Sequence, residues 1–208
     1  LKKKKKYWNL LNNYFQVNND LTKKGLKQNL EEVELVLENS VKKMMLADVE
    51  VGCFLSGGID SSLIASLMQK NSKKKIKTYT VGFSETAFDE STYAKHISRY
   101  LGTDHNEIIV SINDLIENIN KIIDIYDEPF ADSSCLPTEL ICKFASRDLK
   151  VILSGDGGDE IFLGYNRYLF AKKIKSFHSY LPRSLRIMIQ SILNSFPSVF
   201  YDFISIPF

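Results

Sequence analysis

The chain has 208 residues, enough for one good hydrophobic core or for one domain and part of a second. Its 27 basic and 25 acidic side chains leave a formal net charge of +2, which excludes the strongly positive field that nucleic-acid binding requires. No apolar run is long enough to span a membrane or resembles a signal peptide, and the three cysteines lack zinc-ligand spacing, so we expect a cytoplasmic protein with reduced thiols.

The first half of the chain alternates between helix and strand patterns. Apolar residues spaced three and four apart predict a helix from Leu26 to Met44. The apolar run 49–55 predicts a buried strand, and a glycine turn and a helix over 62–69 follow it. The β-branched and aromatic stretch 76–83 predicts the next strand, after which Asp89 is the expected N-cap of a helix that ends at Gly102.

The second half continues this alternation. The expected elements are a strand from His105, a helix over 112–126, a loop containing Pro129 and Pro137, a helix over 140–149 and a strand over 151–153. Strands that alternate with helices predict an α/β fold, a parallel sheet with helices on both faces. We expect a linker over 1–24, this α/β domain over 25–170, and the start of a helical lobe over 171–208.

Two glycine-rich turns carry the chemistry. SGGIDSS at 56–62 and SGDGGDE at 154–160 both follow predicted strands, so they should face one crevice at the carboxyl edge of the sheet. Glycines let an anion approach bare N–H groups, and a helix that begins behind them adds the positive end of its dipole. No GxxxxGK motif occurs, which argues against transfer of a γ-phosphoryl group.

SGGIDSS after a strand resembles the pyrophosphate loop of the ATP-pyrophosphatase enzymes. Together with VILSGDGGDEIFLGYNRY, YTVGF, FDESTYAKHIS, LGTDHNEI and YDEPFADSS in this order, it resembles the synthetase domain of glutamine-dependent asparagine synthetases. The resemblance implies the adenine nucleotide α-hydrolase-like (PP-loop) fold. It also implies adenylation of the aspartate side chain by ATP, release of pyrophosphate, and attack by ammonia to give asparagine and AMP.

The resemblance also assigns residues. Carboxylate oxygens suit Mg²⁺, and Asp60 and Asp159 are the expected ligands, with helix capping as the alternative for both. Adenine and ribose are expected against the backbone near Leu55, Val81, Ser154 and Gly155. The residues expected to hold the pyrophosphate are Ser56, Gly57, Gly58, Asp60 and Ser61.

Two further residues are candidate catalytic groups. Asp156 stands where many family members carry a glutamate that forms or uses the adenylate, although a shorter carboxylate reaches less far. The resemblance suggests a catalytic part for Tyr165, as in lactam-forming relatives, with packing of its ring under the loop as the alternative. A loop that either meets the amino-acid substrate or simply turns contains Asp127, Glu128, Asp132 and Ser133.

Parts of the resembled enzyme are not found in this sequence. The family's glutaminase uses an N-terminal cysteine, and none lies near Leu1, so we expect a piece of a longer protein whose glutaminase is supplied in cis or in trans. The expected partners are the small molecules aspartate and ammonia. A homodimer is a further possibility, and neither a nucleic acid nor a membrane is expected as a partner. Two alternatives stay open: a relative that adenylates another carboxylate, such as a lactam- or peptide-cyclising synthetase, and a fragment that binds ATP without turnover.

Overall fold

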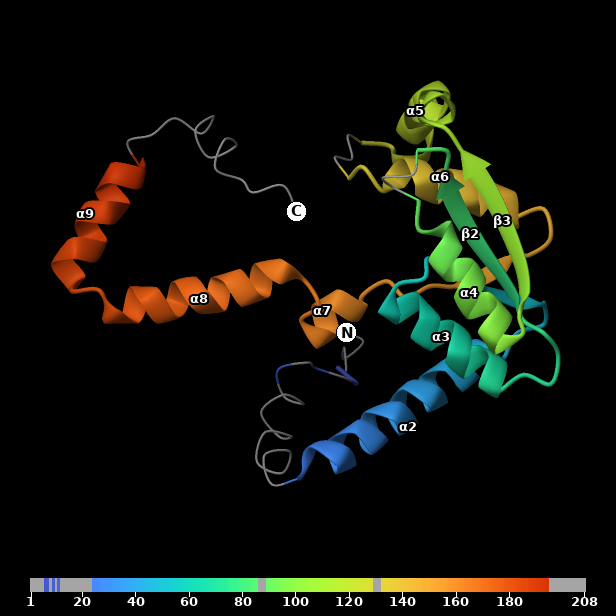
Figure 1. Cartoon of the computed structure of the whole chain (residues 1–208), viewed down its shortest axis with the longest axis horizontal. Helices are drawn as coiled ribbons and strands as arrows, with labels where there is room; N and C mark the ends of the chain where they lie inside the picture. Colours follow the sequence, from blue (N-terminus) through green and yellow to red (C-terminus); the bar gives the residue numbers. More distant parts are fainter. Residues whose placement is uncertain are drawn as a thin grey trace, which may run out of the picture. The chain divides into compact units, whose positions relative to one another are not determined.

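The computed structural model describes residues 6, 7, 9, 11, 24–85, 89–128 and 132–194 (Figure 1). The chain divides into two compact units, Leu1–Asp156 and Gly157–Phe208. Among the described residues, no helix is long and apolar enough to cross a membrane.

The first unit is built around a four-stranded parallel sheet in the order β3-β2-β1-β4. Its elements are α2 (Leu26–Met44), β1 (Val51–Phe54), α3 (Ile59–Lys70), β2 (Lys77–Phe83), α4 (Ser91–Leu101), β3 (Asp104–Val110), α5 (Ile112–Tyr126), α6 (Cys135–Ala145) and β4 (Val151–Leu153). The predicted α/β fold with an all-parallel sheet is therefore confirmed.

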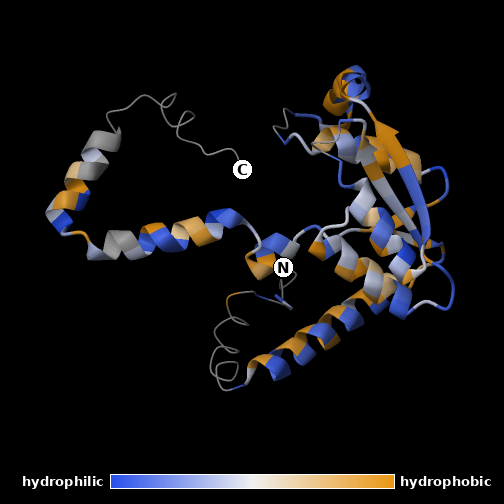
Figure 2. Ribbon diagram, viewed as in Figure 1, coloured by the Kyte–Doolittle hydropathy of each residue, from blue (hydrophilic) through white to orange (hydrophobic). Residues whose placement is uncertain are grey.

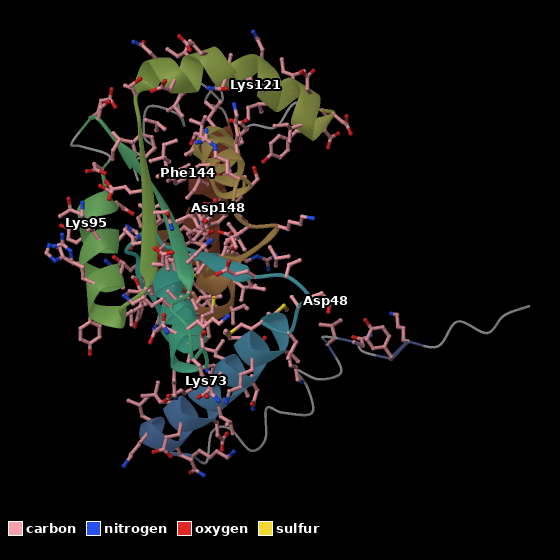
Figure 3. All side chains as sticks on the ribbon, turned by 90° about the vertical axis from the view of Figure 1, so that its right-hand side faces the viewer. Asp48, Lys73, Lys95, Lys121, Phe144 and Asp148 are labelled. Carbon is pink, nitrogen blue, oxygen red and sulfur yellow. The ribbon has the colours of Figure 1, made fainter. Side chains whose placement is uncertain are left out.

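The order of the strands explains why helices cover both faces of the sheet. From β1 the chain moves in one direction to β2 and β3, and later returns to the other side of β1 to form β4. Because crossovers between parallel strands are right-handed, connections that run in opposite directions place their helices on opposite faces. Figure 3 shows this arrangement, with Lys95 of α4 on one side of the strands and Phe144 of α6 on the other.

Each face has its own hydrophobic core. On one face, β1 packs against α2, α3 and α4, and the most buried residues include Val41, Cys53, Leu55, Met68 and Ala94. On the other face, the fully buried ring of Tyr79 packs against Ile141, Ala145 and Leu149. The Tyr79 hydroxyl donates a hydrogen bond of 3.1 Å to Asp148, and burial is the main cause that raises the Tyr79 pKa to about 12.

Two predicted helix starts are wrong. α3 begins at Ile59 and not at 62, because Gly58 takes an extended conformation and serves as the N-cap, which puts Asp60 in the first helical turn. α6 begins at Cys135 and not at 140. Pro137 is its third residue, where an N–H group has no partner within a helix, so the proline costs no hydrogen bond.

The predicted N-cap of α4 is off by one residue: Glu90 holds the N-cap position, and Asp89 stands just before it. The Asp89 carboxylate accepts hydrogen bonds from the N–H groups of Ser91 at 3.1 Å and Phe83 at 3.3 Å, so it joins the end of β2 to the start of α4. Hydrogen bonding to Ser91 lowers the pKa of this carboxyl. Gly102 ends α4 in the left-handed conformation, as predicted.

The second unit is helical in its described part. It contains α7 (Gly158–Phe162), α8 (Asn166–Tyr180) and α9 (Arg183–Asn194). The short helix α7 lies between two left-handed residues, Gly157 with φ of 89° and Leu163 with φ of 59°.

Candidate functional site

The candidate site lies where the strand order reverses. β1 and β4 are neighbours in the sheet, and the chain leaves their carboxyl ends in the turns that begin at Ser56 and Ser154. Open parallel sheets bind ligands at this kind of topological switch point, because the two following loops diverge there.

The two turns touch through Gly155. A Cβ atom added at Gly155 would lie 2.7 Å from the Ser61 nitrogen and 2.9 Å from the Asp60 carbonyl carbon. Only a residue without a side chain allows this approach, since such contacts are closer than real Cβ atoms make. The prediction that both turns meet at one edge of the sheet holds for the residues of the first unit.

The first turn requires glycine at position 57 for two reasons. Gly57 has a φ of 86°, in the left-handed region that favours glycine. A Cβ atom there would also lie 2.7 Å from the Tyr93 Cβ and 2.8 Å from the Ala94 nitrogen. The turn therefore packs directly on the first turns of α4 as well as on the start of α3.

Serine hydroxyls hold the turn in shape. The buried Ser61 hydroxyl accepts a 3.2 Å hydrogen bond from the Ser56 N–H and lies 2.9 Å from the Ser56 hydroxyl. The Ser56 hydroxyl in turn accepts a 3.2 Å bond from the Gly58 N–H. The Ser62 hydroxyl donates to the Gly58 carbonyl at 2.5 Å. These bonds hold the turn and the start of α3 in one arrangement.

The start of α3 supplies donors and a carboxylate together. The N–H groups of Ile59, Asp60 and Ser61 belong to the first turn, where a helix offers them no carbonyl partner. The positive end of the dipole of this 12-residue helix lies at the same place. Asp60 is the one acidic residue of that turn. This arrangement can bind a phosphate group through N–H donors and a cation beside it through the carboxylate.

The residues whose backbone is expected along adenine and ribose come from two neighbouring strand ends and from the second turn. Leu55 is buried with the α2, α3 and α4 face, whereas Val81 packs with the opposite face. The Leu55 N–H donates to the Tyr79 carbonyl at 2.9 Å, and its carbonyl accepts from the Thr80 hydroxyl. Ser154 and Gly155, by contrast, lie in the second turn as expected.

Asp156 is oriented by its neighbour. The Ser154 hydroxyl donates a 2.9 Å hydrogen bond to the Asp156 carboxylate and accepts a 3.4 Å bond from the Asp156 N–H. The carboxylate is exposed, so its remaining acceptor positions are open to water or to a ligand.

Asp159 and Tyr165 belong to the second unit. Gly164 is packed so closely on Asp159 that a Cβ atom there would lie against the Asp159 carboxylate, and the Gly164 N–H donates 3.0 Å to the Asp159 carbonyl. The two expected metal ligands, Asp60 and Asp159, are thus in different units. Within the described residues there is no group of three or more His, Cys, Asp or Glu that could hold a metal ion.

Tyr165 has two partners that sequence reasoning missed. Its hydroxyl donates a 2.7 Å hydrogen bond to Glu160, and the Arg167 guanidinium lies 4.3 Å from the centre of its ring. The hydrogen bond raises the pKa of Tyr165 and lowers that of Glu160. No sequence signal marks these partners, because the backbone reverses at Leu163 and Gly164 between α7 and α8.

The loop after α5 carries two local features that turn the chain. Asp127 ends the helix in the left-handed conformation with φ of 54°. The Asp132 carboxylate accepts a 2.9 Å hydrogen bond from the Ser134 N–H, and this bonding lowers its pKa. Glu128 and Ser133 are exposed, and residues 129–131 between them lie outside the described part.

Fold and site together define a class: an α/β protein with a glycine-rich turn and a helix N-terminus, suited to an anion, at the switch point of a parallel sheet. The family model for asparagine synthase matches residues 32–199. The chain belongs to the asparagine synthase family.

Individual relatives agree with this assignment. The chain is 40% identical over 163 residues to a Methanocaldococcus jannaschii protein assigned as a glutamine-hydrolyzing asparagine synthetase. The aligned region covers 78% of this chain and 31% of that protein. It is 34% identical over 184 residues to the Bacillus subtilis asparagine synthetase (glutamine-hydrolyzing) 1, covering 88% of this chain and 29% of the relative. The chain therefore spans about a third or less of the relatives it matches.

Solved structures give a more distant likeness. An NH3-dependent NAD synthetase from Campylobacter jejuni aligns with a TM-score of 0.45 and 18% identity, covering 65% of this chain and 60% of the other. An NMN synthetase from Francisella tularensis aligns with a TM-score of 0.46 and 18% identity, over 65% of this chain and 58% of the other.

Proposed function

We propose that this chain is the ATP-binding part of an asparagine synthetase, an ATP-dependent amide ligase of amino-acid biosynthesis. The observation that carries the proposal is the preformed turn at Ser56–Ser62, which joins glycines, free helix N–H groups and Asp60 at one point. Membership of the asparagine synthase family supports it.

The donors of the site fit ATP with Mg²⁺. In proteins this ion usually binds one or two carboxylates, together with phosphate oxygens and water, so a cluster of three carboxylates is not needed. Asp60 and Asp159 stay the proposed ligands of the ion. When bound, Mg²⁺ neutralises charge that develops on the departing pyrophosphate.

The chain's own residues would bind and orient the nucleotide. The β- and γ-phosphates would be surrounded by the N–H groups at the start of α3 and by Ser56, Gly57, Gly58 and Ser61. N–H donors that are already aligned need no reorganisation as charge builds on the leaving group. One oxygen of the aspartate side chain would form a bond to the α-phosphorus, and the bond to the pyrophosphate oxygen would break. Ammonia would then displace AMP from the acyl adenylate.

We assign the remaining groups as follows. Ser154 and Gly155, with the backbone near Leu55 and Val81, would lie along adenine and ribose. Asp156 would act in forming or using the adenylate, held by the Ser154 hydroxyl, and Tyr165 stays a second catalytic candidate. The substrates would be aspartate and ammonia in the cytoplasm, and a glutaminase in cis or in trans would supply the ammonia.

Asp60→Asn tests this proposal on the chain itself. If Mg-ATP binds the folded state alone, nucleotide at about a hundred times its dissociation constant should stabilise the chain by roughly 2.7 kcal/mol, and the melting temperature should rise by roughly 5 to 11 °C. Asparagine keeps the shape and the hydrogen-bonding ability of the side chain but removes the charge that Mg²⁺ needs. The Mg²⁺-dependent part of the rise should vanish in this variant.

A matched control is Asp48→Asn, because Asp48 is exposed and lies between α2 and β1 (Figure 3). Its response to Mg-ATP should equal that of the unmodified chain. An unchanged response in Asp60→Asn would limit Asp60 to a role within the first turn of α3 and would remove the central claim. ATP–pyrophosphate exchange with a panel of amino acids then separates aspartate from other carboxylates, and no exchange would favour ATP binding without turnover.

A further inference from the structure

Asp89 joins two backbone segments that lie next to the candidate site. Its carboxylate accepts a hydrogen bond of 3.1 Å from the Ser91 N–H at the start of α4, and one of 3.3 Å from the Phe83 N–H at the end of β2. Hydrogen bonds to Ser91 are the main cause that lowers the pKa of Asp89, so the acceptor is a charged carboxylate at neutral pH. Hydrogen bonds to a charged acceptor are about twice as strong as those between neutral groups.

A glycine in β2 makes room for this carboxylate. A Cβ atom added at Gly82 would lie 2.9 Å from Asp89 Oδ1 and 2.9 Å from the Ser91 Cβ, closer than real Cβ atoms approach. On the other side, the Ile109 Cδ1 would be 2.7 Å away, and the apolar end of β3 to which it belongs is the orange arrowhead in Figure 2. The carboxylate is thus held in a close-packed corner between strand and helix.

The start of α4 also supports the glycine turn after β1. A Cβ atom at Gly57 would lie 2.7 Å from the Tyr93 Cβ and 2.8 Å from the Ala94 nitrogen, so the turn rests on the helix backbone itself. Apolar packing does little to fix the helix ahead of Ala94, because the buried side chain there is Ser91 and the Tyr93 residue is 66% exposed. The hydrogen bonds of the carboxylate are therefore what holds this part of α4 in place.

We propose that Asp89 is a positioning residue for the turn at Ser56–Ser62: by joining the start of α4 to the end of β2, it sets where Gly57 and the N–H groups of that turn lie. The effect on nucleotide binding rests on the proposed function, which assigns this turn to the phosphates. In this role Asp89 acts through α4 and makes no contact with the nucleotide. A residue that only stabilises α4 would leave the turn unchanged, so the two roles can be separated.

Amide hydrogen exchange tests the coupling without nucleotide. Asp114→Ala is the matched control, because the Asp114 carboxylate also accepts a hydrogen bond from a backbone N–H at a helix start, but on α5 after β3, a strand that β2 separates from β1. In Asp89→Ala, exchange of the Ser62 N–H should become roughly tenfold faster, whereas exchange of the Leu115 N–H in α5 should not change. In Asp114→Ala the reverse should hold. The melting temperature should fall by roughly 2 to 4 °C in both.

Titration with Mg-ATP is the second measurement. Asp89→Ala should weaken binding roughly tenfold, since hydrogen bonds to a charged acceptor contribute about that factor, and Asp114→Ala should leave it unchanged. Asp89→Asn keeps an acceptor oxygen for both N–H groups. This variant should therefore restore the exchange of the Ser62 N–H and most of the affinity.

Three outcomes separate the possibilities. Equal effects of Asp89→Ala and Asp114→Ala on the turn would overturn the proposal, because both would then act through stability alone. A loss in Asp89→Asn as large as in Asp89→Ala would also overturn it, because the charge and not the position would then matter. No Mg-ATP binding by the unmodified chain would reject the proposed function, while amide exchange in the two alanine variants would still decide whether Asp89 positions the turn.

Discussion

The contact between the two turns makes Gly155→Ala the most informative substitution in the first unit. Gly155 does not have a left-handed φ, so alanine can adopt its backbone conformation, and any effect must come from the added methyl group. That group would lie 2.7 Å from the Ser61 nitrogen, whereas ordinary contact begins at 3.4 Å, so the start of α3 and the second turn must separate by 3.4 − 2.7 = 0.7 Å. Overpacking of this kind costs about 1 to 3 kcal/mol.

Thermal unfolding and Mg-ATP titration measure the two consequences. The melting temperature should fall by roughly 2 to 12 °C, and the affinity for Mg-ATP should fall at least tenfold, because the N–H groups that are proposed to bind phosphate move with Ser61. Gly25→Ala is the control: no atom of the described residues lies within 4 Å of its added Cβ, and it should leave the affinity unchanged. Equal affinities in the two variants would refute the reasoning that the contact at Gly155 sets the geometry of the turn.

Three further predictions concern other parts of the first unit. Tyr79→Phe should cost about 0.5 to 1.5 kcal/mol in urea unfolding because the partly buried hydrogen bond to the exposed Asp148 is lost, while Tyr100→Phe, on an exposed ring, should cost nothing measurable. Burial is the main cause that lowers the His105 pKa below its ordinary 6.5; the charge of Lys95 also lowers it, and that of Glu107 raises it. The unfolded chain therefore takes up the proton first, and stability should be lost as the pH falls below about 6.5. His105→Gln should flatten this part of the pH profile and His96→Gln should not; equal profiles would reject the assignment. In the full enzyme, Asp156→Ala should reduce ATP–pyrophosphate exchange far more than Mg-ATP affinity, and equal losses would assign Asp156 to nucleotide binding.

Local patterns in the sequence predict much of the fold. The helix over 112–126 and the strand over 151–153 have the predicted bounds, because apolar spacing and strand length are properties of consecutive residues. The start of α6 is mispredicted because a proline was treated as a breaker, although the first turn of a helix tolerates it at Pro137.

The site is predicted by residue type more than by geometry. The sequence predicts that the two turns need glycine at 57 and 155, but it does not show which atoms approach each glycine. The same holds for the burial of the Ser61 hydroxyl and for the bond between Glu160 and Tyr165. Leu55 and Val81 lie on opposite faces because each side chain follows the pleat of its own strand.

The position of β4 beside β1 bears on how the chain folds during synthesis. Cys53 pairs with Thr78, 78 − 53 = 25 residues away, whereas Val51 pairs with Val151, 151 − 51 = 100 residues away. Closing the longer loop costs about 1.2 kcal/mol more, because each doubling of loop length adds about 0.6 kcal/mol. At roughly 5 to 20 residues per second, the ribosome needs several seconds to make the residues between β2 and β4. During that time the three earlier strands can pair while the free edge of β1 stays open to a chaperone or to another nascent chain.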